Sequence, residues 1–185
     1  MTETLFRHGA GRLCLDFIRT LRYRGTAEAT EELADATALS VWIDQIGPRE
    51  INTADSPTAA QVRQARSLRE AIRELITARM ATGSASVAAR RRVNQAASRS
   101  VPAPRLDDSG RLRWHADDGV EAFFAVLARD ALDLVTSPAI TRVRACANQT
   151  CGALFLDSSR PGTRRWCSMD TCGNQAKKAA LRGKR

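Results

Sequence analysis

Long apolar runs are absent from this sequence. No stretch of about 18 uncharged apolar residues occurs in its 185 residues, which is roughly the length that a helix needs to cross a bilayer. The opening residues MTETLFRHGAGRLCLDF also lack the apolar stretch and small-residue cleavage site of a signal peptide. With 43% hydrophobic residues, the chain can still bury a core. We therefore expect a soluble, cytoplasmic protein with no membrane partner, built as one ordinary domain plus a small appendage.

Residues that commonly carry catalysis are scarce. The two histidines, His8 and His115, are far apart and have no ligand partner at metal spacing. Nothing matches a Walker loop, a dinucleotide fingerprint, a nucleophile elbow or a zincin helix. Cys14 lies in an apolar stripe, where a small core residue is the simpler interpretation than a nucleophile. We therefore expect that the protein is not an enzyme.

Four of the five cysteines gather in CANQTCGALFLDSSRPGTRRWCSMDTCGNQAKK, residues 146–178. They form two pairs with the same C-x4-C spacing, and fifteen residues separate the pairs. In a reducing compartment paired cysteines are more often metal ligands than disulfides, and an odd total fits a disulfide framework poorly. Structural Zn²⁺ prefers a closed shell of thiolates. The spacing predicts one Zn²⁺ held by Cys146, Cys151, Cys167 and Cys172; the alternative is two disulfides or four free thiols.

Positive charge is concentrated in the same segment. Residues 141–185 hold ten Lys and Arg against two Asp, so that +8 of the net +9 lies in the last quarter of the chain. Four zinc-bound thiolates would leave about +6. A field of this sign attracts phosphate backbones. The candidate phosphate contacts are Arg160, Arg164, Arg165, Lys177, Lys178 and Arg182, followed by Lys184 and Arg185. Asn174 and Gln175 could reach base edges, although Asn174 could equally serve only to cap a helix.

Helical periodicity dominates the first three quarters. Apolar residues recur at intervals of three and four in the segments 11–25, 37–47, 57–82, 86–97 and 118–138. Thr37 is the expected N-cap of the second helix and Gly47-Pro48 its stop, and Gly83 should end the third. The stretch VPAPRLDDSGRLRWHADD interrupts the pattern and predicts a β-hairpin near Leu106–Trp114. Arg90–Arg92 should lie on a solvated helix face.

One helix face is a candidate effector site. Asp16, Arg19, Thr20 and Tyr23 share the polar side of the first predicted helix. Such a stripe could line an effector site, face solvent or form a buried salt bridge.

The cysteine segment predicts a small module of its own. Ala153–Leu156 and Arg164–Trp166 are expected as two short strands around a turn at Arg160–Gly162, and AKKAALRGK as a helix after the last ligand. This order is typical of a treble-clef-like zinc finger, in which metal binding supplies most of the folding free energy. Phe155 and Trp166 would form its small core. The predicted fold is mainly α: a helical domain with a small β-hairpin over residues 1–137, then the finger with its basic helix over 138–185, the boundary falling between Ser137 and Arg144.

The tail resembles the CGNR zinc-finger family. That family reads C-x4-C-x3-F, an Arg-rich turn, R-R-W-C-S and C-G-N-R, and the matching residues are Cys146, Cys151, Phe155, Arg164, Arg165, Trp166, Cys167, Ser168, Met169, Cys172, Gly173 and Asn174. Gln175 stands where the family has its name-giving arginine, and Lys177 and Lys178 follow at once.

Upstream, LCLDFIRTLRYRG resembles the opening of the ABATE domain, which precedes this finger in bacterial proteins described as stress-induced transcription regulators. Arg19 replaces the asparagine usual there. The resemblance implies a transcription regulator that binds DNA through the finger, with a helical domain that senses an effector or mediates association. A second copy of the chain, forming a homodimer, is one expected partner. The alternative is a non-enzymatic adaptor whose finger binds RNA or a protein partner.

Overall fold

The structure, a computed structural model, describes residues 6–47 and 56–182. Its architecture is mainly helical with three small antiparallel strand pairs and a cluster of four cysteines near the carboxyl end. The predicted fold class is confirmed. Within the described residues, no helix is both long and apolar enough to cross a membrane.

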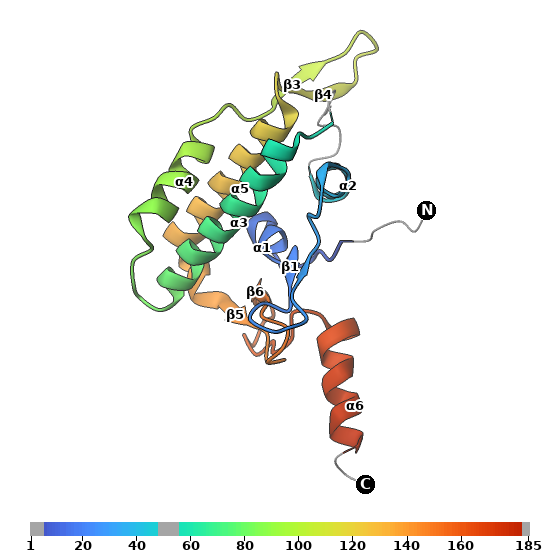
Figure 1. The fold of residues 1–185 in the computed structure, drawn as a ribbon, viewed down its shortest axis with the longest axis vertical. Coiled ribbons are helices and arrows are strands. Elements are labelled where there is room, and N and C mark those ends of the chain that lie inside the picture. The colour runs from blue at the N-terminus through green and yellow to red at the C-terminus, as the bar shows by residue number, and fades with distance from the viewer. Residues whose placement is uncertain (1–5, 48–55, 183–185) are drawn as a thin grey trace.

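Three helices form the centre of the fold and pack pairwise against one another (Figure 1): α3 (Ala59–Met80), α4 (Val87–Ala97) and α5 (Gly119–Thr136). The short helix α1 (Leu13–Ile18) packs against α3 and α5, and α2 (Ala36–Ile46) packs against α3. The rings of Phe17, Trp42 and Phe123 join these layers, with centroids 5.2 Å apart for the first pair and 5.4 Å for the second. Aromatic contacts at this separation add to the burial that holds the helices together.

The helix boundaries follow their capping residues. Asp35 caps α2 by accepting from the Ala38 amide, so the expected Thr37 cap is wrong, and Gly47 ends the helix as predicted. Pro48 lies outside the described residues. Thr58 and Gln61 form a reciprocal capping box at the start of α3.

The predicted hairpin is confirmed as β3 (Ala103–Leu106) paired with β4 (Leu112–His115). A second, two-residue pair joins β1 (Leu21–Arg22) to β2 (Thr30–Glu31) just after α1. The β3–β4 hairpin projects from the end of the bundle, whereas β1 lies near α1 on the side toward the finger (Figure 1).

The tail continues from α5 without a long linker. A 3₁₀ turn, η1 (Pro138–Arg142), leads into β5 (Val143–Ala145), which pairs with β6 (Leu154–Leu156). The strand predicted over 164–166 does not form, and β6 finds its partner before the first cysteine instead. A π turn, η2 (Met169–Gly173), then starts α6 (Asn174–Arg182).

The finger does not have a separate core. Phe155 is fully buried and Trp166 partly so, but both belong to the one apolar cluster that runs through the helical bundle. The Leu156 amide donates to the Ala10 carbonyl at 2.8 Å. Gly11, at φ +90°, is needed for this approach, because a Cβ there would lie 3.0 Å from the Cβ of Leu156. The expectation of a core private to the finger is therefore wrong.

Candidate zinc centre and nucleic-acid surface

Four sulfur atoms meet at the base of the finger. The Sγ atoms of Cys146, Cys151, Cys167 and Cys172 all lie within 4.8 Å of one another. Cys167 Sγ is 3.6 Å from that of Cys151 and 3.7 Å from that of Cys172. A tetrahedron with Zn–S bonds of about 2.3 Å has S–S edges of about 3.8 Å. The donor set therefore fits one tetrahedral Zn²⁺ in type, number and spacing.

Local backbone structure aims the first pair of ligands. Cys146 follows β5 and its amide donates to the Ala153 carbonyl at 2.9 Å, while the Cys151 amide closes a turn onto the Asn148 carbonyl at 3.0 Å. Gly152 leaves this turn at φ +63°, and a Cβ there would lie 3.3 Å from the Cβ of Arg24. A glycine adopts the left-handed backbone without strain and leaves room for Arg24, because it has no Cβ.

The second pair is placed by the turn before α6, and hydrogen bonds tune the sulfurs. The Cys167 amide points at Cys146 Sγ at 3.5 Å, and Asn148 Nδ2 lies 3.8 Å from Cys172 Sγ. Such donors stabilise thiolates around a metal. Without a cation, a hydrogen bond with the Cys167 thiol lowers the pKa of Cys151 to about 5 and raises that of Cys167. Four neighbouring thiolates therefore need a cation to coexist.

Comparison with known families now assigns this centre. Residues 11–138 match the ABATE model, described as "Putative stress-induced transcription regulator". The chain belongs to the ABATE family. Residues 142–185 match the CGNR zinc finger, so the cysteine cluster is the site of one structural Zn²⁺. A comparison with curated proteins finds no match.

Cys14 of this ABATE protein is fully buried in the bundle, where burial raises the pKa of its thiol well above the usual value.

The arginines of the finger divide into two kinds. Arg164 Nε donates to the Trp166 carbonyl at 2.9 Å, its Nη2 donates to the Cys167 carbonyl, and its guanidinium lies 4.5 Å from the centre of the Phe155 ring. This side chain holds the backbone that carries the third ligand. Arg165 is exposed and rests 5.2 Å from the Trp166 ring centre, and Arg160 is also exposed. Of these three arginines, Arg160 and Arg165 are therefore the ones accessible for phosphate contact.

Asp157, which the sequence analysis did not single out, closes the loop between β6 and Arg164. Its carboxylate accepts from the Ser159 hydroxyl and amide and from the Arg164 amide. These hydrogen bonds, the Ser159 hydroxyl first, lower the pKa of Asp157. The D-S-S stretch is a turn signal that could have indicated this role. The hydrogen bonds to the buried Asp157 carboxylate therefore fix the loop that carries Arg160.

Helix α6 carries the remaining cations on an unpacked surface. None of its residues is buried, and it projects away from the helical bundle (Figure 1). Lys177, Lys178 and Arg182 are exposed, and no ion pair joins them to a carboxylate in the described part of the chain. Lys184 and Arg185 lie outside the described residues.

Asn174 and Gln175 make internal hydrogen bonds at the start of α6. Asn174 Nδ2 donates to the Asp170 carbonyl at 3.2 Å, so its side chain bonds the preceding turn rather than capping free amides. Gln175 Oε1 accepts from Asn148 Nδ2 at 3.0 Å. Asn148 therefore links the metal site to α6, a role that the sequence analysis missed. Gln175 is exposed, and its Nε2 is a potential donor.

The four candidate effector residues do not gather on one open face. Asp16 accepts from the Gly9 and Ala10 amides and pairs with Arg19 at 3.3 Å, with the Arg19 side chain only 4% exposed. Burial raises the pKa of Asp16. Tyr23 lies beyond α1, in the left-handed region at φ 51°.

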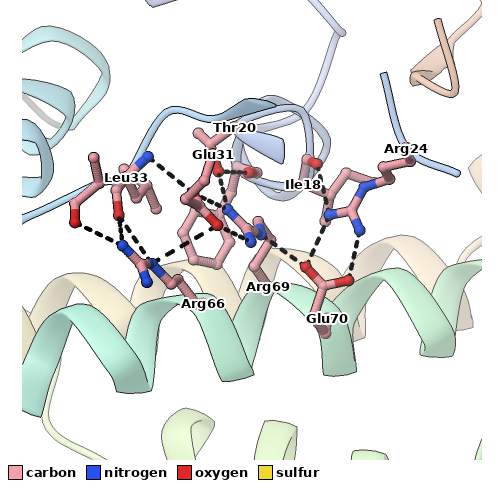
Figure 2. A network of polar contacts seen from close by, with 10 residues as sticks. Ile18, Thr20, Arg24, Glu31, Leu33, Arg66, Arg69 and Glu70 are labelled. Atoms are coloured by element: carbon pink, nitrogen blue, oxygen red, sulfur yellow. Dashed lines mark hydrogen bonds and ion pairs between the residues drawn. The ribbon is translucent and has the colours of Figure 1, made fainter. Parts of the chain in front are cut away.

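Thr20 is drawn into a different network, which lies between α3 and the β1–β2 hairpin (Figure 2). Arg69 donates to Thr20 Oγ1 at 3.1 Å and to both carboxylate oxygens of Glu31 at 2.6 Å. The space beside Arg19 and Tyr23 measures about 10 Å³, enough for about one water molecule. A space of this size does not hold an organic effector.

Proposed function

We propose that this ABATE protein regulates transcription by binding duplex DNA. In this proposal α6 enters the major groove, and the loop of residues 157–165, which we call the arginine loop, contacts the DNA backbone. The observation that carries the proposal is the projecting, unpacked helix with Lys177, Lys178 and Arg182 on its surface. The major groove, about 12 Å wide, admits an α-helix. Arg160 and Arg165, on the loop beside the metal site, would add phosphate contacts.

The zinc has a structural role in this proposal. Four thiolates complete a tetrahedral shell and leave no position for a water or a substrate. The metal would hold the start of α6 against the loop that carries Arg165, so that both surfaces approach one duplex together. This chemistry supports a binding protein and not an enzyme.

Fluorescence anisotropy with a labelled duplex tests the proposal. We expect binding to weaken with salt, by about 0.9 log unit of affinity per log unit of salt for each phosphate contacted. Lys177→Gln with Lys178→Gln should weaken binding to all sequences and reduce that slope by about 1–2. Arg91→Gln with Arg92→Gln removes the same charge from the exposed face of α4 and is the matched control.

Gln175→Ala separates base reading from a structural role. If its Nε2 reads a base, the substitution should cost about 1–3 kcal/mol on the preferred site and little on random duplex. Equal effects of the α6 and α4 double variants would refute the DNA surface. Salt-independent duplex binding, with a structured RNA or a protein competing for Lys177 and Lys178, would instead favour the adaptor.

A further inference from the structure

The β3–β4 hairpin has one apolar face. Its register pairs Pro104 with Trp114 and Leu106 with Leu112, and side chains directly opposite one another point to the same side of a sheet. These four residues are the apolar face of the hairpin. Leu106 is 74% exposed and Leu112 is 50% exposed. A lone hairpin with this surface in water is marginally stable.

An apolar groove adjoins this face. Trp114 also lines an open groove of about 520 Å³, whose floor is completed by Val101, Pro102 and Val126 of α5. Its rim carries Arg12, Arg129, Asp130 and Asp133. We call this the α5 groove. Because Trp114 belongs to both, the hairpin face and the groove form one continuous apolar surface, of the kind that marks protein contacts.

The charges around this surface favour a protein partner. The groove rim has two arginines and two aspartates. The hairpin, residues 103–115, has Asp107 and Asp108 with three arginines, a net charge of +1. Neither set has the large excess of positive charge that nucleic acid or an anionic membrane would need. Asp133 pairs with Arg12 at 2.6 Å, yet its side chain is 66% exposed and can accept from a further arginine of a hairpin. Arg129 donates to the Ala97 and Arg99 carbonyls, and its exposed guanidinium complements the aspartates of the hairpin turn.

The same chain supplies both halves of the contact. The protruding leucine pair is the convex half, and the groove at the base of the hairpin is the concave half. Two copies related by a two-fold axis can therefore satisfy both contacts at once, which is the requirement for a closed isologous dimer. We propose that a second copy of this chain places its Leu106–Leu112 pair in the α5 groove, and the reverse. Figure 1 shows the hairpin at the end of the molecule away from α6, so this contact leaves both fingers free.

Sedimentation velocity of the zinc-loaded full chain tests this proposal. Across about 1–100 μM, the range of a modest interface, the 20.2 kDa chain should shift from monomer to dimer. Leu106→Asp should raise the dimer dissociation constant at least about a hundredfold, because a two-fold axis removes the leucine from two contacts. Val126→Asp should act in the same way from the opposite side of the contact.

The chain offers matched controls. Val87 on α4 is 71% exposed and Leu181 on α6 is 68% exposed, so Val87→Asp and Leu181→Asp make the same change elsewhere and should leave the dimer intact. Thermal melts at 1 μM or less verify folding, because an exposed Leu106 contributes little to the monomer. A wild-type chain that is monomeric at about 100 μM, or a dimer that survives Leu106→Asp, would overturn the proposal.

Discussion

Replacing Arg164 should release the metal, although this residue resembles a DNA contact in the sequence. Arg164→Ala removes two hydrogen bonds from a charged donor to the carbonyls of Trp166 and Cys167, together with its contact with the Phe155 ring. Each such hydrogen bond contributes about 1.5–3 kcal/mol, and a cation over a ring about 0.5–1 kcal/mol at an accessible site. For a partly exposed side chain the lower ends apply, a total of about 3.5 kcal/mol.

Because metal binding and folding of a finger are coupled, this loss should appear in the zinc affinity. A factor of ten corresponds to about 1.4 kcal/mol, so zinc should bind roughly three-hundredfold more weakly. Competition with a chromogenic chelator measures this directly. Arg165→Ala, at the exposed neighbour, is the control and should change zinc affinity less than about threefold while weakening DNA binding. Equal zinc affinities of the two variants would refute the positioning role of Arg164.

Three further predictions concern the rest of the molecule. Arg69→Met should lower the melting temperature by about 10 °C in calorimetry, because it removes the buried guanidinium that pairs with Glu31 and Glu70 and leaves half-buried Glu31 with only the longer ion pair to Arg66; exposed Arg91→Met should change it little. Burial alone would raise the pKa of Glu70, but the hydrogen bonds from Arg24 and Arg69 outweigh this effect and lower the pKa. The ion pairs of Glu70 therefore contribute their full stability above about pH 4.3, the pKa of a glutamate in the unfolded chain. This contribution is lost as the pH falls through the lowered pKa of Glu70 in the folded protein. In urea titrations Glu70→Gln should be less stable than wild type at neutral pH, with the gap closing in acid; a gap independent of pH would contradict this. Chelating zinc should release α6, which has 9 residues against the 22 of α3 and 18 of α5, so most of the helical circular dichroism should remain; its complete loss would show one cooperative unit.

The zinc ligands and the main helices could be predicted from the sequence because their signals are local. C-x4-C spacing lets one turn aim two sulfurs at one ion, and the structure brings all four together. The apolar stripe of the third predicted helix likewise becomes the buried side of α3 at Val62, Leu68, Ile72 and Ile76. Neither inference needs knowledge of distant contacts.

The prediction failed where a distant segment decides the outcome. The partner of β6 is β5, on the other side of the first two ligands, and nothing local distinguishes Val143–Ala145 from a linker. Charge alone also cannot tell Arg164, which donates to backbone carbonyls, from Arg165, which is exposed. Thr20 resembles part of a solvated helix face until Arg69, far along the chain, reaches it.

Strand β6 joins the metal site to the helical bundle. Leu154 and Phe155 are 4% and 0% exposed within the apolar cluster that also contains Cys151, Cys167 and Cys172. A segment of about 40 residues cannot build an adequate core of its own. Strand β6 therefore packs into the apolar core of the bundle, and zinc orders the opposite part of the finger, which carries the ligand turns. The pairing of β5 with β6 and the hydrogen bond from Leu156 to Ala10 do not involve the metal. Loss of zinc should therefore loosen the ligand turns and η2 first, and separate α6 from the arginine loop while β6 stays on the bundle. The geometry of the proposed DNA surface thus depends on the metal more strongly than the stability of the helical domain does.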